Sequence, residues 1–274
     1  MKKIIAIQGA EGSNHHKVAI DFYGKEIQLA ECMSFDVLVD SLLNNSADVG
    51  VMALENTIAG SIIPNYALID NSNLHIIDEE YLNIHHHLMA LKNQTLEDIK
   101  EVWSHPMALL QCKEFFKKYP NIKLVEDVDT AEVAKRISQK NLKGIAAIAP
   151  KIAAEIFDLE ILEDEIQTIK DNSTRFVIVQ TSKPALNENV NKASLKFQLN
   201  HKRGSLAAIL NVLSDCKMNL TKIQSLPVIE TPWKYSFFVD ITFDDYNDYK
   251  KAASILEIMA EEFKVLGTYK NGRR

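Results

Sequence analysis

Ile4-Ile5-Ala6-Ile7-Gln8 is a short apolar run that ends at Gly9 and is followed, after Gly12-Ser13, by a helical stretch from about His15 to Tyr23. β-Branched residues favour a strand and glycine permits a tight turn, so the predicted order is strand, turn, helix. An apolar strand meets polar, helix-capping residues at three further places: Val49–Leu54 before Glu55-Asn56-Thr57, Glu101–Trp103 before Ser104-His105-Pro106, and Gly144–Ala149 before Pro150. Strands that alternate with helices predict an open, largely parallel α/β sheet. Such sheets bind small ligands at the carboxyl ends of their strands, so we expect the chemistry at these turns.

The last third of the sequence has a different pattern. Thr181–Lys192 has the composition of a linker. Beyond it, the periodicity predicts strands at Ser194–Leu199, Leu220–Leu226, Tyr235–Phe243 and Val265–Tyr269, and helices at Gly204–Cys216 and Tyr249–Phe263. The order βαββαβ is that of a ferredoxin-like domain. We therefore expect a linker at residues 184–192 between two domains.

Composition limits the class of protein. The 274 residues are 46% hydrophobic and 25% charged, which is typical of a globular chain of about two domains. The net charge of −6 argues against binding to nucleic acid. The apolar run at the N-terminus is too short for a signal peptide, and no uncharged run is long enough to cross a membrane, so a cytoplasmic protein is expected. Three widely spaced cysteines, Cys32, Cys112 and Cys216, are expected to be buried, reduced thiols.

Four turns carry the candidate polar side chains. They are Gly9-Ala10-Glu11-Gly12-Ser13, Glu55-Asn56-Thr57-Ile58-Ala59-Gly60, Ser104-His105-Pro106 with Gln111, and Asp171-Asn172-Ser173-Thr174-Arg175-Phe176. The glycines of the first turn would let backbone N–H groups approach an anion at a helix start. If Pro106 opens a helix, Gln111 lies about one and a half turns into it. Each turn taken alone also fits a helix cap or a solvated surface.

Taken together, the motifs of residues 1–270 resemble the prephenate dehydratase family. The resemblance rests on Thr174-Arg175-Phe176, on Glu55-Asn56-Thr57-x-x-Gly60, on Ser104-His105-Pro106-x-Ala108-Leu109-x-Gln111-Cys112, and on Ile84-His85-His86-His87. The C-terminal part resembles an ACT regulatory domain through Gly204-Ser205-Leu206 and Asn219-Leu220-Thr221-Lys222-Ile223.

The resemblance implies a fold and a domain plan. It implies a two-lobed α/β catalytic domain of the type II periplasmic-binding-protein kind over residues 1–183, with lobes at about 1–76 with 170–183 and at 77–169. A linker at 184–192 and a ferredoxin-like ACT domain at 193–274 would follow. ACT domains commonly bind amino acids at subunit interfaces, so a homodimer or homotetramer is expected. Since no chorismate mutase helices precede Met1, a single activity is expected.

The implied activity is the conversion of prephenate to phenylpyruvate, water and CO2, with L-phenylalanine as effector. The resemblance implies catalytic roles for Thr174, Glu55 and Gln111, and substrate contacts for Ser13, Asn56, Thr57, Ser104, Arg175 and Phe176. It implies an effector site at Gly204, Ser205, Leu206, Asn219, Leu220, Gln224 and Ser225. Arogenate dehydratase and a non-catalytic amino-acid sensor on the same scaffold remain alternatives. An acid–relay set favours the enzymes, because a sensor does not need one.

The reaction requires no metal, nucleotide or electron sink, because aromatisation of the ring drives it, so no cofactor is expected. His85-His86-His87 suggests a metal site, but no carboxylate or cysteine stands at ligand spacing, and on a strand only alternate histidines share a face. We therefore expect no metal.

Two loops depart from the family pattern. The first loop usually reads Gly-Pro-x-Gly-Thr-aromatic-Ser, where this chain has Ala10, Ser13, Asn14 and His15 in place of Pro, Thr, the aromatic residue and Ser. Gln224 and Leu226 replace the Glu and Arg of the family's Glu-Ser-Arg-Pro. We therefore expect phenylalanine to bind but to inhibit more weakly than the full motif would allow.

Overall fold

The computed structural model describes residues 2–200, 202–228 and 234–273. By its internal contacts the chain forms two compact units, Met1–Ser61 with Tyr81–Phe176, and Ile62–Glu80 with Val177–Arg274. The boundaries of these units differ from those of the domains expected from the sequence. The expected domain boundaries stay a prediction. In the described part of the chain, no helix combines the length and apolar character that crossing a membrane requires.

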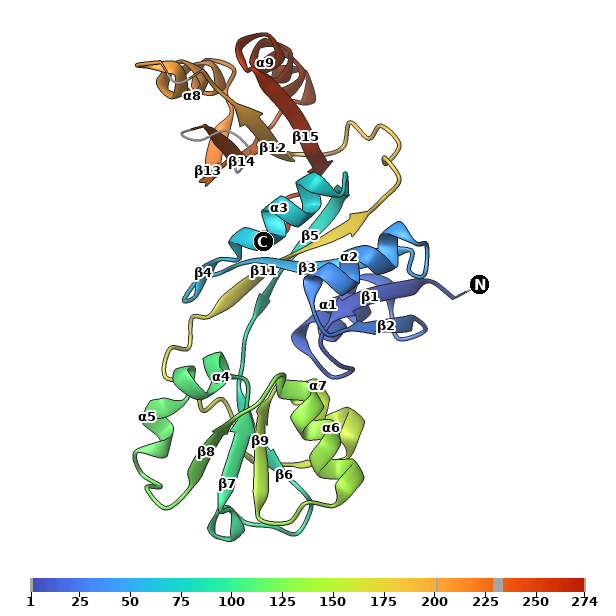
Figure 1. Ribbon diagram of the computed structural model, residues 1–274, viewed down its shortest axis with the longest axis vertical. Helices are drawn as coiled ribbons and strands as arrows, with labels where there is room; N and C mark the ends of the chain where they lie inside the picture. Colours follow the sequence, from blue (N-terminus) through green and yellow to red (C-terminus); the bar gives the residue numbers. More distant parts are fainter. Residues whose placement is uncertain (1, 201, 229–233, 274) are drawn as a thin grey trace. The chain divides into compact units, whose positions relative to one another are not determined.

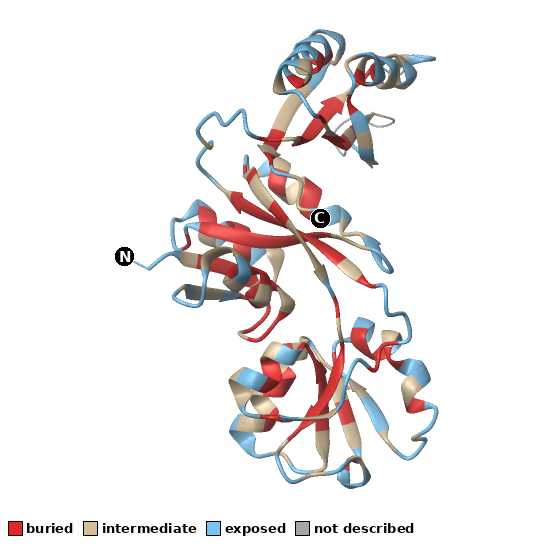
Figure 2. Cartoon of the chain, turned by 180° about the vertical axis from the view of Figure 1, so that it is seen from behind, coloured by how far each residue is buried: buried red, intermediate tan, exposed pale blue. Residues whose placement is uncertain are grey.

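The first sheet begins with the strand–turn–helix pattern expected from the sequence. Its strands stand in the order β2-β1-β3-β11-β5, with β4 paired to β3, and β1 is parallel to both β2 and β3. The elements are β1 (Ile4–Gln8), α1 (Asn14–Tyr23), β2 (Gln28–Cys32), α2 (Phe35–Leu43), β3 (Val49–Asn56), β4 (Gly60–Ser61), α3 (Ile63–Asn71), β5 (His75–Asn83) and β11 (Ser173–Gln180). β5 and β11 each continue from one unit into the other. Figure 2 shows that the buried residues follow the strands.

The second sheet lies wholly in the first unit. Its order is β10-β6-β9-β7-β8, with β7 parallel to β8 and β9, and with β6 antiparallel to β9 and β10. The elements are β6 (His87–Ala90), the 3₁₀ turn η1 (Leu96–Asp98), β7 (Glu101–Ser104), α4 (Pro106–Gln111), α5 (Lys113–Phe116), β8 (Lys123–Glu126), α6 (Thr130–Lys140), β9 (Ile145–Ala149), α7 (Lys151–Phe157) and β10 (Glu160–Glu163). Ile148 packs with α4 and α5, whereas Ala147 packs with α6 and α7, because successive strand residues face opposite sides. Figure 1 shows the two helix pairs on opposite sides of this sheet.

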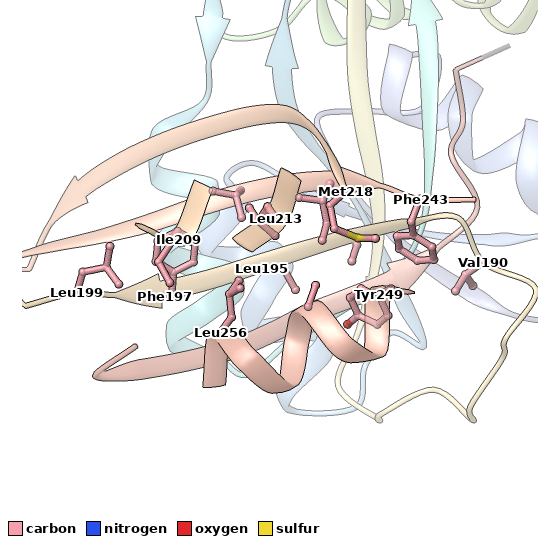
Figure 3. Close-up of a cluster of buried hydrophobic side chains, with 14 residues drawn as sticks. Val190, Leu195, Phe197, Leu199, Ile209, Leu213, Met218, Phe243, Tyr249 and Leu256 are labelled. Carbon is pink, nitrogen blue, oxygen red and sulfur yellow. The ribbon is translucent and has the colours of Figure 1, made fainter. Parts of the chain in front are cut away.

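The C-terminal elements form a four-stranded antiparallel sheet in the order β13-β14-β12-β15. They are β12 (Lys192–Gln198), α8 (Ser205–Asp215), β13 (Asn219–Pro227), β14 (Tyr235–Thr242), α9 (Tyr246–Met259) and β15 (Glu262–Tyr269). The βαββαβ order is the expected ferredoxin-like one. Leu195 and Phe197 on β12 pack against Leu213 of α8 and Leu256 of α9 in one apolar core (Figure 3).

Two boundaries differ from the expectation. The helix expected at Tyr249–Phe263 spans Tyr246–Met259, because Asp245 caps its start by accepting the N–H of Asn247 and Ala260 is extended. Phe263 instead lies in β15. Lys192, expected to end the linker, begins β12 and is buried.

Buried and half-buried charges hold β12 and β15 to α3 and β5 within the second unit. Lys192 Nζ lies 2.8 Å from both carboxylate oxygens of Glu79. Lys196 and Lys264 both contact Asp70, at 2.7 and 2.8 Å. A Cβ at Gly267 would stand 2.1 Å from the carbonyl oxygen of Ile76, so β15 and β5 approach at a distance that only glycine allows.

Candidate active site

A chain of hydrogen bonds joins the ends of β3 and β11. Asn56, the last residue of β3, donates from Nδ2 to Asn172 Oδ1 (2.6 Å) and to Thr174 Oγ1 (2.9 Å). Its Oδ1 accepts the backbone N–H groups of Ile58 (2.9 Å) and Ala59 (2.8 Å). Asn172 and Thr174 are both buried. The polar turn after β3 and the start of β11 therefore form one cluster.

The chain continues to Gln111, at the end of α4, and to His86. Asn172 Nδ2 donates to Gln111 Oε1 (3.1 Å), and His86 Nε2 lies 2.7 Å from the same oxygen. Burial lowers the pKa of His86, which keeps the imidazole neutral. We call Asn56, Asn172, Thr174, Gln111 and His86 the amide network. All five side chains are uncharged.

Thr57 and Ser173 join the same two strands through the backbone. The N–H of Thr57 donates to the Ser173 carbonyl, and the N–H of Ser173 donates to Thr57 Oγ1, both at 2.9 Å. The Thr57 hydroxyl oxygen therefore braces the turn, and its substrate contact stays a prediction.

Strand alternation separates the remaining residues of the two motifs. Thr174 and Phe176 share one face of β11, and buried Arg175 faces the other side. Likewise Glu55 faces opposite Asn56 on β3, where it pairs in register with Ser61. The catalytic role of Glu55 and the substrate contacts of Arg175 and Phe176 stay predictions. Phe176 shares the face of Thr174, whereas Arg175 and Glu55 face away from their neighbours Thr174 and Asn56.

Ser104 has a hydrogen-bond partner within the second sheet. Its side chain is fully buried, and its hydroxyl donates to the Ile148 carbonyl oxygen at 2.7 Å. In this structure the hydroxyl proton is used within the second sheet, and the substrate contact of Ser104 stays a prediction. Cys112, next to Gln111, is a buried thiol, and burial raises its pKa to about 12, which disfavours the thiolate that a nucleophile requires. Cys216 is half-buried rather than buried.

The turn Gly9–Ser13 leads into α1, and Ser13 is the N-cap residue of that helix. Ser13 caps α1 by accepting the N–H of His16 at 3.3 Å, and it is 4% exposed. His15 packs edge-on against Phe35 and Phe176, with ring centroids 5.7 and 4.9 Å away. Burial lowers the pKa of His15 to about 3, so this imidazole is neutral.

The three adjacent histidines have carboxylate neighbours that sequence spacing did not reveal. Asp164 Oδ1 lies 2.9 Å from His87 Nδ1, and Glu165 Oε1 lies 3.3 Å from His85 Nδ1. Even so, among residues 2–200, 202–228 and 234–273, no three His, Cys, Asp or Glu side chains are grouped as a metal ion would require.

Two cavities accompany these residues. The larger, of about 1210 Å³ in the first unit, is lined by residues that include Glu11, His16, Lys17, His85, Lys151 and Glu165, and no member of the amide network is among its lining residues. A smaller one, of about 140 Å³ in the second unit, is lined by Ser205 and Leu206 with Asn200, Lys202, Tyr235 and Phe237. Ser205 and Leu206 were expected at the effector site.

The other expected effector residues lie on the same ferredoxin-like fold. Gly204 precedes α8 with φ at +86°, a conformation that favours glycine. Asn219 Nδ2 is 3.5 Å from Thr242 Oγ1, and Gln224 Nε2 donates to the Ser225 carbonyl. Leu220, like these two, belongs to the edge strand β13.

The sequence drew attention to the turns but missed two members of the amide network. Asn172 and His86 stand inside the quoted motifs, yet no role was assigned to them. Their positions could have identified them, because Asn172 directly precedes β11 and His86 directly precedes β6. Which of several neighbouring polar side chains turns inward depends on strand register, which the motifs alone do not contain.

These sheets and the ferredoxin-like C-terminal fold define an α/β protein. Residues 5–184 match the family model described as prephenate dehydratase. The chain is 31% identical over 266 residues to the bifunctional chorismate mutase/prephenate dehydratase of Buchnera aphidicola from Acyrthosiphon pisum, covering 95% of this chain and 69% of the relative. It is 34% identical to the arogenate dehydratase/prephenate dehydratase 2 of Arabidopsis thaliana, covering 97% and 72%. The chain therefore belongs to the prephenate dehydratase family.

Solved structures share its fold. One, titled GqqA, a novel type of quorum quenching acylases, has a TM-score of 0.88 at 25% identity and covers 98% of both chains. Another, prephenate dehydratase from Arthrobacter aurescens in complex with L-Phe, has a TM-score of 0.86 at 24% identity, covering 98% of this chain and 90% of that one. The second likeness shows the fold alone.

Proposed function

We propose that this chain converts prephenate to phenylpyruvate, releasing water and CO2, and that Thr174 handles the departing hydroxyl group. Membership of the prephenate dehydratase family supports the reaction. The observation that carries the role of Thr174 is the direction of its hydrogen bond. Since Thr174 Oγ1 accepts from Asn56 Nδ2, its own proton is left to donate elsewhere.

That arrangement suits the difficult step of the reaction. The ring C–O bond breaks as the C–C bond to the carboxylate breaks, and the electron pair of the latter completes the aromatic ring. The leaving hydroxide needs a proton as it departs. A hydroxyl that accepts a hydrogen bond is polarised into a better donor, which is what Asn56 does for Thr174. The elimination is redox-neutral and leaves the substrate ring as its own electron acceptor.

A direct assay tests the reaction. Purified protein is given prephenate or arogenate, and phenylpyruvate or phenylalanine is measured. The proposal expects turnover of prephenate by the native chain and a loss of turnover in Gln111→Ala. Gln139→Ala, which removes an exposed amide on α6, is the control and should keep native turnover. If only arogenate is turned over, arogenate and not prephenate is the substrate. If neither compound is turned over, the proposal is wrong. An acylase assay belongs beside it, because one similar structure carries that title.

We further propose that residues 193–274 act as an ACT domain that binds L-phenylalanine in a homo-oligomer. The ferredoxin-like strand order and the cavity beside Ser205 and Leu206 support this. Because Gln224 and Leu226 lack the charges of the family motif, coupling should be weaker by about 1–3 kcal/mol, or roughly 5- to 150-fold in the effector's effect.

Phenylalanine titration of the native chain and of Gln224→Glu/Leu226→Arg checks that regulation. We expect clearly tighter inhibition of the double variant. Equal inhibition constants would show that Gln224 and Leu226 brace the strand as well as the charged pair does.

A further inference from the structure

In the amide network, which side-chain atom donates and which accepts is fixed by the contact between Asn56 and the backbone. The backbone N–H groups of Ile58 and Ala59 can only donate, so the side-chain atom of Asn56 that faces them is its oxygen. Asn56 must then present Nδ2 to Asn172 and Thr174. The amide of Asn56 cannot flip without placing NH2 against two N–H donors.

This direction passes along the network residue by residue. Asn172 meets an NH2 group from Asn56, so its oxygen faces Asn56 and its own NH2 faces Gln111. Gln111 therefore presents its oxygen to Asn172. Because the same oxygen lies 2.7 Å from His86 Nε2, the imidazole must carry its proton on Nε2 and donate it.

The surroundings of His86 fit that tautomer. Among the described residues, His86 Nδ1 is buried and has no hydrogen-bond partner. A second proton there would place an unpaired charge in the interior, which burial disfavours. The ring is also held in place through its own backbone, because the N–H of His86 donates to Gln167 Oε1 (2.9 Å) and its carbonyl accepts from Ile166 (2.8 Å).

The consequence falls on Gln111. Both lone pairs of its side-chain oxygen are occupied, by His86 and by Asn172. Its NH2 group makes no hydrogen bond to any residue that the structure describes, and the side chain is half-buried. The network therefore presents protons from Gln111 and from Thr174, and so suits the oxygen atoms of a carboxylate or hydroxyl ligand.

We propose that His86 is a positioning residue that, as a neutral Nε2–H donor, fixes the amide of Gln111 with its NH2 group toward the substrate. The expected loss of kcat/KM rests on the proposed function, whereas the tautomer of His86 does not. Without His86, the Gln111 amide loses one of two contacts that orient it, and it can rotate to present its oxygen to an anionic ligand.

Kinetics of a double-mutant cycle test this role. We expect His86→Leu to lower kcat/KM roughly 10- to 100-fold, the loss seen when a supporting hydrogen bond to a ligand-binding group is removed. His86→Gln, which keeps an N–H donor, should recover most of that loss. In a Gln111→Ala background, His86→Leu should have no further effect, because there is no amide left to orient. Multiplicative losses in the double variant would overturn the proposal.

His75→Leu is the matched control for folding, since His75 is half-buried and makes none of the network's hydrogen bonds. If His86→Leu melts well below the native chain, the tautomer of His86 in the native chain decides the proposal instead.

NMR of the ¹⁵N-histidine-labelled native chain at pH 7 tests the tautomer without any substrate. The proposal expects one buried histidine, assigned by His86→Gln, with a protonated Nε2 and a bare Nδ1. The Nδ1–H tautomer or an imidazolium would overturn the proposal whatever the enzyme turns over. Conversely, absence of turnover on both substrates would overturn the proposed function and leave the tautomer result standing.

Discussion

Buried polar groups serve opposite purposes in the two units of this chain. The amide network of the first unit contains no charge, and because Thr174 Oγ1 and Gln111 Oε1 accept hydrogen bonds within it, the protons of these two side chains are left for a ligand. The second unit buries full charges instead, with Glu79 and Lys192 0% and 3% exposed at the side chain and paired to each other. A neutral, directed network is free to meet the charge of a ligand, whereas a closed ion pair can only hold protein to protein.

The cost of disturbing the two regions should differ accordingly. Removing a neutral member leaves a hydrogen bond unmade, which costs about 1–3 kcal/mol when the group is buried. Removing one member of a buried ion pair leaves an uncompensated charge and costs about 3–5 kcal/mol. Activity should therefore depend on the first region and stability on the second.

Thr174→Ala should produce the largest effect. Loss of the hydroxyl removes the proposed proton donor and should lower kcat by about 10²–10⁴, while the free energy of unfolding falls by only about 1–3 kcal/mol. Thr174→Ser, which keeps the hydroxyl, is the control. A Thr174→Ala variant that keeps more than about half of the native kcat on prephenate would place the proton donor elsewhere.

Lys192→Met should show the reverse behaviour. Glu79 would remain buried with its main countercharge gone, so the free energy of unfolding should fall by about 3–5 kcal/mol while kcat at low temperature changes little. Urea denaturation followed by circular dichroism measures the loss. The double variant Glu79→Leu/Lys192→Met should recover much of the lost stability, because no unpaired charge remains buried. If the double variant is no more stable than Lys192→Met, the unpaired carboxylate of Glu79 is not the cause of the loss.

Acid should destabilise the folded chain through His15, a buried neutral histidine of the first unit. The pKa of His15 is about 3 in the folded chain against 6.5 when unfolded, so between these values the unfolded state binds the extra proton. Stability should therefore be intact above about pH 6.5 and fall as pH decreases toward 3, by about 1.4 kcal/mol per pH unit from this residue. Urea midpoints of the native chain and His15→Gln at pH 7 and 4.5 test this. Parallel pH profiles for the two proteins would rule out His15 as a source of acid sensitivity.

Lys17→Ala should have the smallest effect. Lys17 and Asp21 pair one turn apart on α1 with side chains 42% and 36% exposed, and such surface pairs contribute about 0.3–0.5 kcal/mol. Thermal melts at low and high salt measure it. A loss comparable to that of Lys192→Met would remove the distinction between exposed and buried ion pairs in this chain.

The sequence predicted the elements better than the contacts. The strand–turn–helix repeats and the βαββαβ order follow from local periodicity, and both are confirmed. The end of α9 was misplaced by a few residues, because Phe263 continues the apolar period of the helix while belonging to β15. Lys192 was assigned to the linker because its partner, Glu79, lies 113 residues away and leaves no local trace.

The same reasoning explains the candidate site. Asn56, Gln111 and Thr174 were singled out from motifs and do meet in the amide network. Ser104 has the same kind of motif context, but its hydroxyl turns to the Ile148 carbonyl. Whether a hydroxyl faces a ligand or a neighbouring strand is decided by side-chain direction, which residue type alone does not determine.

The order of synthesis gives the contacts of Asp70 a further consequence. Lys264, which reaches both the carbonyl and the carboxylate of Asp70, is translated 194 residues after it. Glu79 lacks its partner until Lys192 is made, Asp70 lacks its two lysines until Lys196 and Lys264 are made, and Gly267 reaches the Ile76 backbone later still. The segment 62–80 therefore completes its ion pairs and its packing against β15 only after most of the chain has been made.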